Sequence, residues 1–424
     1  MTRSRTLPPL VVTCVALAAC GTGALPGCKR AADQDPPPCQ DEAQPRALTL
    51  VDDDAFDLGP YLMQTTASSV VVMWRTLEPG SSVVEFGTGT EPDQTVTGDD
   101  DRTVHEVTVS GLSADTRYVY RARTGATTSL LHHFRTAPEP RSGFRFTVLG
   151  DSQGHPETSE PLFRAMAATN PHFVLHVGDV VSDGTVARQW KEQFFDPLRP
   201  LGHEVPTFVA IGNHERQSDT YFDLVSYPNT GTEPFHESSY AFTWGNGFVL
   251  VVDSTQFFWP VGGTETDLST WVRDTVASDA ARDATWRIAA THQSGYSEGW
   301  SPGECDGFDG FPPVRDFLLP LLAENGFHLF LAGHTHAYER GFKDGILQVI
   351  TGGGGGSLDE WCRDWPHVTR FSAQHHWLSV TAGCDALEVR ATGTDGGLID
   401  RVLLRADRSG EIVEQSPADG GVSP

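Results

Sequence analysis

Basic residues are scarce in this sequence. Its 424 residues include 30 Lys and Arg against 56 Asp and Glu, a formal net charge of -26 at pH 7. A surface of that sign repels the backbone of nucleic acids, so duplex DNA or RNA is not an expected partner. A small phosphate-ester substrate would have to be attracted by a local positive centre, and bound metal ions are the obvious candidates.

Closely spaced cysteine pairs are also missing. None of the seven cysteines has the CxxC spacing typical of a zinc cluster. Five cysteines follow Cys20, an odd number, so at least one stays unpaired or pairs between chains. Cys28 and Cys39 are candidates to close a small loop, and Cys305 and Cys362 are candidates to join loops near the predicted site. The pairing stays open at this point.

Beyond the N-terminus there is no apolar run long enough to cross a membrane. Arg3 and Arg5 precede the apolar run 10–19, which is followed by Cys20, a pattern that predicts an export signal. Leu17-Ala18-Ala19-Cys20 resembles the bacterial lipobox, which implies cleavage before Cys20 and a lipid on that residue. We therefore expect a lipoprotein anchored at the cell envelope or surface. The alternative is a secreted protein in which Cys20 has no role.

Length and composition predict more than one domain, since 38% of residues are hydrophobic and 20% charged. The segments that we expect are a lipoprotein signal peptide (1–19), a Pro-rich tether (20–54), a β-sandwich (55–138), a catalytic domain (142–405) and a flexible tail (406–424).

Residues 55–138 carry only strand signals. Short apolar or alternating runs at 70–74, 82–86, 106–109 and 118–123 are separated by turn residues. This spacing predicts an all-β sandwich. The stretch 111–120, with Leu112 and Tyr118, resembles the corner that locks the last strands of fibronectin type III domains, and 58–64 resembles their opening strand.

From Phe144 onward the pattern changes to buried strands that alternate with longer polar stretches. Nearly continuous apolar runs lie at 144–149, 173–177, 207–211, 248–252, 287–290 and 329–332. Such runs are typical of strands covered on both faces in a layered α/β fold. Binding sites in these sheets lie beyond the carboxyl ends of the strands.

Polar motifs follow these strands directly. They are Gly150-Asp151, Gly178-Asp179, Gly212-Asn213-His214-Glu215, His292 and Gly333-His334-Thr335-His336. Singly, each has an ordinary explanation, such as a turn, a helix cap or a structural histidine. In the last motif we expect Gly333 to permit the bend that separates the two histidines. Jointly, six oxygen and nitrogen ligands at strand exits predict two adjacent metal ions.

The chemistry of such a pair accounts for the residue types. Two ions about 3.5 Å apart need an anionic oxygen between them, for which we assign Asp179, and mixed oxygen and imidazole ligands suit divalent Zn, Fe or Mn. A metal-held hydroxide would then attack phosphorus while the ions neutralise the phosphoryl oxygens.

These motifs, followed by Ala337-Tyr338-Glu339-Arg340, resemble those of calcineurin-like metallophosphoesterases, and in detail purple acid phosphatases with an N-terminal fibronectin-type domain. The resemblance covers roughly residues 55–405 and includes 292–297, 239–242 and the glycines 352–356. It implies an all-β sandwich followed by a four-layer α/β (α-β-β-α) catalytic domain, and an acid-phosphatase-like monoesterase. A metal-dependent phosphodiesterase is the alternative.

Carried over by motif, the resemblance implies a role for each site residue. Asp151, Asp179 and His336 would hold the first metal, and Asp179, Asn213, His292 and His334 the second. His214 would face the phosphate and protonate the leaving group. Tyr296 would offer a hydroxyl to the substrate, with a packed loop tyrosine as the alternative, and Glu215 would orient His214 or cap a helix.

Two positions depart from the purple acid phosphatase pattern. Ser182 stands where the family has the tyrosine that colours ferric iron, so this protein should not be purple. Gln153 stands where many relatives have a further ligand or glycine. Our hypothesis is that the Gln153 amide oxygen, or His155, partly replaces that ligand and leaves the first site open to Zn, Fe(II) or Mn; a mixed-valence pair is the family's other form.

Two other functions are alternatives to a metallophosphatase. Gly150-Asp151-Ser152 matches the start of GDSL-type Ser esterases, and Asp364-Trp365-Pro366-His367 supplies their late Asp-x-x-His. That interpretation leaves the strand-exit histidines unexplained. The other rival is a non-catalytic surface protein whose altered site only binds metal or anions.

Overall fold

The computed structural model describes Cys39 and residues 47–228, 236–257 and 265–415. The predicted signal peptide, Cys20 and Cys28 lie outside these residues. No helix within the described ranges is long and apolar enough to span a bilayer.

The predicted sandwich is present. One sheet has the strand order β1 (Leu58–Met63), β2 (Ser69–Gly80) and β5 (Arg102–Ser110). The other has β4 (Gln94–Thr97), β3 (Val83–Gly87), β6 (Arg117–Thr124) and β7 (Thr127–Thr128), with β8 (His132–Arg135) also paired to β6. Alternate residues point into the core, where Trp74 and Tyr120 are fully buried.

The fibronectin-like corner is also confirmed. The Tyr118 hydroxyl accepts a hydrogen bond from the Ser113 amide at 2.9 Å, just after the buried Leu112. This bond fixes the turn before β6, as in the tyrosine corners of immunoglobulin-like sandwiches.

The part of the chain that follows the sandwich contains two seven-stranded sheets among the described residues. The first has the order β11 (Thr207–Val209), β10 (Phe173–His176), β9 (Phe144–Leu149), β21 (His376–Ala382), β22 (Ala386–Gly393), β23 (Leu398–Arg405) and β24 (Gly410–Gln415). The second has the order β12 (Tyr240–Trp244), β13 (Gly247–Val251), β14 (Trp286–Ala290), β16 (Leu329–Ala332), β18 (Ile346–Thr351), β17 (Tyr338–Lys343) and β20 (Val368–Ser372).

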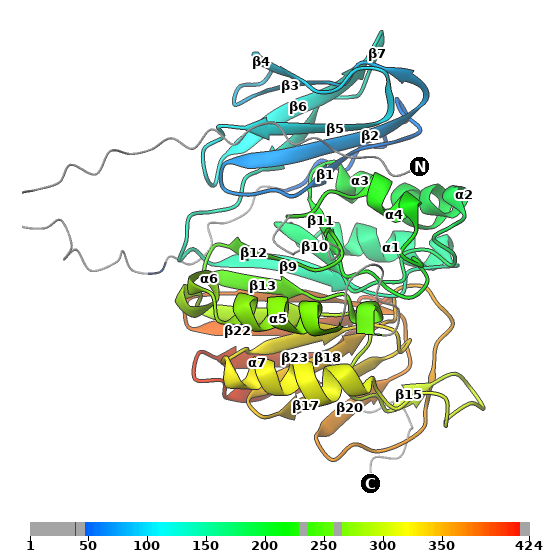
Figure 1. The fold of residues 1–424 in the computed structure, drawn as a ribbon, viewed down its shortest axis with the longest axis vertical. Helices are drawn as coiled ribbons and strands as arrows, with labels where there is room; N and C mark the ends of the chain where they lie inside the picture. The colour runs from blue at the N-terminus through cyan, green and yellow to red at the C-terminus, as the bar shows by residue number, and fades with distance from the viewer. Residues whose placement is uncertain (1–38, 40–46, 229–235, 258–264, 416–424) are drawn as a thin grey trace, which may run out of the picture. The chain divides into compact units, whose positions relative to one another are not determined.

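Side chains of the second sheet alternate between two apolar cores. In β13, Val249 and Val251 face the core shared with the first sheet, while Phe248 and Leu250 face the outer core. Helices α5 (Glu265–Val276) and α7 (Leu319–Glu324) cover that outer face, with α6 (Asp279–Asp283) beside them (Figure 1). This alternation explains why the strand sequences are apolar throughout.

The first sheet carries its own helices. They are α1 (Pro156–Ala167), α2 (Ala187–Gln189), α3 (Asp196–Gly202) and α4 (Asp219–Leu224), with a π-helical turn at Trp190–Phe195 between α2 and α3. Leu162, Phe163 and Met166 of α1 are buried in the shared core. Two sheets with helices outside them give the four-layer α-β-β-α arrangement that the resemblance implies.

Two segments differ from the sequence-based expectation. Within the predicted tail 406–424, Gly410–Gln415 forms β24, antiparallel to β23, so the prediction of a flexible tail is wrong for these residues. The prediction that Cys28 and Cys39 close a small loop is also wrong, because Cys39 is bonded to Cys384, 345 residues away. The predicted Cys305–Cys362 bond is present.

Candidate metal centre

The polar motifs meet where the two sheets end together. Strands β9, β10 and β11 run parallel in the first sheet, and β14 and β16 run parallel in the second. Each is followed within four residues by one of the predicted ligands. Because parallel strands end at one edge of their sheet, motifs far apart in sequence become neighbours.

Asp179, His292 and His334 form the tightest cluster. His292 Nε2 lies 3.0 Å from Asp179 Oδ2 and 3.2 Å from His334 Nδ1. It also lies 3.1 Å from Asn213 Oδ1. The ligand atoms of the first three residues all lie within 4.8 Å of one another. A carboxylate and two imidazoles at this spacing are a donor set that suits a first-row divalent ion.

Asp151, His336 and Gln153 gather on the other side of the centre. His336 Nε2 lies 3.5 Å from Asp151 Oδ1 and 3.4 Å from Gln153 Nε2. The Gln153 Oε1 atom is buried and has no hydrogen-bond partner in the structure. A buried amide oxygen without a partner is costly unless it meets a donor or a cation. This orphaned atom fits the predicted ligand role of Gln153.

Hydrogen bonds from Nδ1 to backbone carbonyls set the ring orientation of two histidines. His292 Nδ1 donates to the Val177 carbonyl at 2.8 Å, and His336 Nδ1 donates to the Ser357 carbonyl at 2.7 Å. These bonds leave each Nε2 unprotonated in the neutral ring and directed at the cluster. Such outer hydrogen bonds are typical of metal-ligating histidines.

The backbone of three predicted ligands is in the left-handed region. Asp151 has φ 57°, Asp179 φ 55° and His334 φ 69°. Conformations of this kind cost free energy in non-glycine residues and concentrate at functional sites. The bend that we expected at Gly333 is therefore made by His334. Gly333 serves close approach instead, because a Cβ there would lie 2.3 Å from Asp151 Oδ2.

Charges in the centre are strongly coupled. Burial opposes ionisation of Asp179, but His292 outweighs it and lowers the pKa of Asp179. Burial likewise lowers the pKa of His292, yet the Asp179 charge raises that pKa to about 10. Burial lowers the pKa of His334 to about 3, with His292 adding to the effect. Without metal, a proton therefore sits on His292, and a bound cation would displace it.

His214 lies at the rim of the centre. Its Nδ1 donates to the Ser182 carbonyl at 2.7 Å, and its Nε2 lies 3.9 Å from Asp179 Oδ2. Its side chain is 40% exposed, unlike the buried ligand His292. The ring therefore points one nitrogen at the centre while remaining open to solvent.

Glu215 has a role that the sequence did not suggest. Its buried carboxylate accepts hydrogen bonds from the amides of Gly212 at 2.6 Å, Asp179 at 3.0 Å and Val180 at 2.8 Å. It thus holds the Asp179 loop, rather than orienting His214 or capping a helix. Burial, reinforced by the Asp179 charge, raises the pKa of Glu215 to about 7. Only the position of Glu215 in the Asn-His-Glu motif hinted at a function.

Ser182 and His155, which belong to the two departures from the family pattern, contact neighbouring side chains. Ser182 Oγ donates to Gln193 Oε1 at 3.0 Å, and the same oxygen accepts the Gly154 amide at 3.1 Å. Gln193 thus joins the loops of the first two motifs. His155 is directed elsewhere, since its Nδ1 lies 3.1 Å from Glu157 Oε1 on the surface.

Tyr296 and Ser152 lie in packed environments. The Tyr296 ring packs edge-on against Trp365 and His367, at 4.9 and 4.5 Å between centroids, as expected of a packed loop tyrosine. Ser152 is fully buried, and its Oγ lies 2.9 Å from His176 Nε2 rather than near His367. The nucleophile arrangement of a GDSL-type esterase is therefore not formed.

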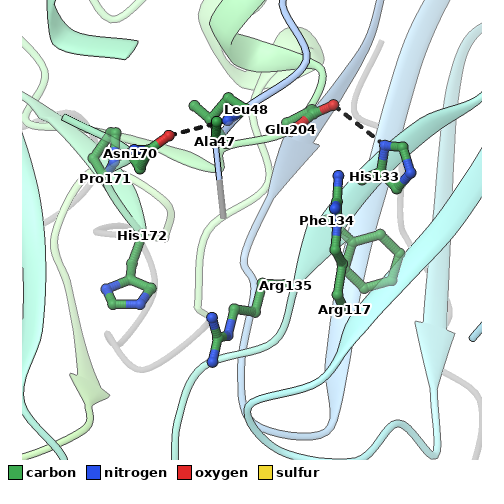
Figure 2. Close-up of a pocket in the computed structure, with 10 residues that line it drawn as sticks. All are labelled: Ala47, Leu48, Arg117, His133, Phe134, Arg135, Asn170, Pro171, His172 and Glu204. Carbon is green, nitrogen blue, oxygen red and sulfur yellow. Dashed lines mark hydrogen bonds and ion pairs between the residues drawn. The ribbon is translucent and has the colours of Figure 1, made fainter. Parts of the chain in front are cut away.

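A cavity of about 80 Å³ lies apart from the candidate metal centre, and none of the predicted metal ligands lines it. Figure 2 shows His133 directed at Glu204, 3.4 Å away, and Asn170 accepting a hydrogen bond from the Leu48 amide at 3.0 Å. Arg135, also on its wall, is paired with Asp115 at 2.7 Å. The His133–Glu204 pair joins the sandwich to the domain that follows it, and the Leu48 amide joins the predicted tether to the same domain.

Known protein families match both parts of the chain. Residues 144–338 match the calcineurin-like phosphoesterase family, and residues 59–136 match the purple acid phosphatase N-terminal domain.

Individual relatives are distant. An uncharacterized protein of Mycobacterium tuberculosis is 26% identical over 65% of this chain and 60% of its own length. A probable inactive purple acid phosphatase of Arabidopsis thaliana is 24% identical over 69% of this chain and 55% of its own length. The chain thus spans less than two thirds of the length of these relatives.

Among solved structures, a purple acid phosphatase from yellow lupin (Lupinus luteus) seeds superposes with a TM-score of 0.68 at 18% identity, covering 86% of this chain and 77% of the other. At that identity the likeness establishes the fold. The two family matches show that residues 144–338 form a calcineurin-like phosphoesterase domain and that residues 59–136 form a purple acid phosphatase N-terminal domain.

Proposed function

We propose that this protein is an exported phosphatase that hydrolyses phosphate monoesters at a dinuclear metal centre. The observation that carries the proposal is the convergence of Asp179, His292 and His334, each from a different strand exit, with their ligand atoms within 4.8 Å of one another. Buried polar groups of this kind, two of them (Asp179 and His334) held in left-handed backbone conformations, are a costly arrangement unless they bind something.

The donor set divides into two sites that share Asp179. Asp151, Asp179 and His336, with the Gln153 oxygen, would hold the first ion. Asp179, Asn213, His292 and His334 would hold the second. The ions, divalent Fe, Zn or Mn, or a mixed-valence pair, would supply Lewis-acid activation of water and neutralise the phosphoryl charge.

The remaining residues of the centre act on the substrate and on its protons. The carbonyl of Ser182 fixes the proton on His214 Nδ1, so His214 can donate from Nε2 only as the doubly protonated ring. A protonated His214 would bind the anionic ester and protonate its leaving oxygen.

The location is an oxidising compartment, as the two disulfides indicate. We further propose that residues 1–19 are cleaved and that Cys20 carries a lipid, which would anchor the protein to the membrane. Mass spectrometry of the mature N-terminus tests this: a diacylglyceryl adduct on Cys20 is expected, and an unmodified terminus elsewhere would contradict it.

The function is tested by hydrolysis of a chromogenic phosphate monoester by the purified protein. We expect turnover that is lost on chelation, recovered on adding Zn, Fe or Mn, and unaffected by Ser152→Ala. Protein with full metal content but no turnover of mono- or diesters would indicate a binding protein instead. Faster hydrolysis of diesters than of monoesters would assign a phosphodiesterase.

A further inference from the structure

Two aromatic side chains lie against the metal centre without a part in metal binding. The Trp300 ring centroid lies 5.3 Å from that of His334, and the Phe308 centroid lies 4.7 Å from it. The two rings contact each other at 4.9 Å. Both are partly exposed. We name Trp300 and Phe308 the aromatic wall.

The aromatic wall is held by its own small framework. Trp300 belongs to β15 (Gly299–Trp300), which pairs with β19 (Glu360–Trp361). The Cys305–Cys362 disulfide joins the same two segments, and the Gly303 amide donates to Glu360 at 2.7 Å. A Cβ on Gly307 would lie 2.4 Å from the indole nitrogen of Trp300, so Gly307 lets the chain approach that ring closely.

A buried carboxylate fixes this framework to the metal-ligand segment. Glu339, in β17, accepts hydrogen bonds from the Glu298 and Gly299 amides, each at 2.9 Å. The Ser297 hydroxyl lies 2.7 Å from that of Thr335, which stands between the two ligand histidines. These hydrogen bonds join the segment just before Trp300 to residues on both sides of His336, and so set the position of Trp300 relative to His334.

We propose that the aromatic wall selects phosphate esters with a flat aromatic leaving group. The inference rests on the proposed function and names its substrate class. An ester whose phosphate reaches the metal centre would bring the group beyond its bridging oxygen to the rim beside His334. An aryl group there would cover the exposed faces of Trp300 and Phe308, while a short alkyl group would leave them in water.

Binding of two phosphonates tests the proposal without turnover. Phenylphosphonate and methylphosphonate carry the same anionic head, so the ratio of their dissociation constants for the metal-loaded protein isolates the ring. We expect about tenfold tighter binding of phenylphosphonate. Trp300→Ala should bring the ratio close to one while metal content is unchanged. Trp300→Leu keeps apolar bulk and should lose the preference too, whereas Trp300→Phe should retain part of it.

Trp361→Ala is the matched control, because Trp361 lies on the paired strand but is 49% exposed. It should keep the full preference. A ratio that Trp300→Ala leaves unchanged would overturn the proposal. So would equal weakening of both phosphonates with loss of metal, which would show that Trp300 only supports His334. Failure of the proposed function looks different: selective phosphonate binding would persist with no hydrolysis of any ester.

Discussion

At the level of single residues, the predicted metal centre depends on side chains that are not themselves predicted to bind metal. Asp179 sits in a left-handed conformation, and the Glu215 carboxylate holds its amide and that of Val180. A carboxylate that accepts several buried amides stabilises a loop that would otherwise leave those donors unpaired. Glu215 is therefore a positioning residue for the predicted bridging ligand.

Glu215→Gln should lower both stability and metal content. The amide offers one acceptor oxygen in place of two and turns an N–H group toward backbone donors, so the free energy of unfolding should fall by about 2–3 kcal/mol. Urea denaturation and metal analysis measure the two effects. Glu192→Gln is the control, because Glu192 makes only a 3.7 Å surface pair with Arg188. Equal stability of the two variants would show that Glu215 does not hold the loop.

His214→Ala should reduce turnover with metal retained. Loss of a general acid costs about 10²–10⁴-fold in rate, and the loss should be larger for alkyl esters, whose leaving oxygen needs the proton, than for nitrophenyl esters. Steady-state kinetics on both ester types, with metal analysis, checks this. An equal loss for both types would remove the acid role, and a loss of metal would place His214 among the ligands.

At the scale of elements, the sandwich contains a buried histidine that links its stability to pH. His105 of β5 stacks on Trp74 at 4.7 Å between ring centroids. Its two ring nitrogens lie 2.8 Å from the Ser82 hydroxyl and 2.9 Å from that of Thr76. Burial lowers the pKa of His105 from 6.5 to about 4. Since the unfolded chain binds the proton more readily, this group stabilises the fold above pH 6.5 and loses that effect as the pH falls toward 4.

His105→Gln should weaken this pH dependence. One pKa unit corresponds to about 1.4 kcal/mol, so the decrease in unfolding free energy from pH 7 to pH 4 should be smaller in the variant by about 2–3 kcal/mol. Denaturant titrations at the two pH values measure the difference. His155→Gln, at a half-exposed surface histidine, should keep the wild-type dependence. If both variants resemble the wild type, His105 is not the linked group.

Strands β9, β10 and β16 of the two large sheets could be predicted from sequence because the apolar run that indicates a strand lies within the strand itself. The apolar runs at 144–149, 173–177 and 329–332 became β9, β10 and β16, in which nearly every residue is buried; in β16, alternate residues face two different cores. The motif order then placed the ligands at strand exits. No local pattern, however, marks β24, which forms only because β23 offers it a free edge.

At the scale of the whole molecule, what the sequence could not predict was set by contacts between distant segments. The Cys39–Cys384 bond spans 345 residues, and the number of possible pairings left it open. Glu215 acts on a loop 36 residues earlier in the chain. The aromatic wall depends on hydrogen bonds to Glu339 and on a disulfide between two cysteines that are 57 residues apart in the sequence. The candidate ligands could be predicted from sequence, but the groups that hold them in place could not.

The strands of the two seven-stranded sheets bring the predicted ligands to one centre, and we propose that this centre holds two ions bridged by Asp179. The metal-to-protein ratio of refilled wild type and Asp179→Asn tests it most directly. We predict two ions per wild-type chain, at most one in the variant, and no tyrosinate-iron colour because Ser182 replaces the tyrosine. One ion or none in the wild type, or the same ratio in both proteins, would show that Asp179 does not bridge two ions.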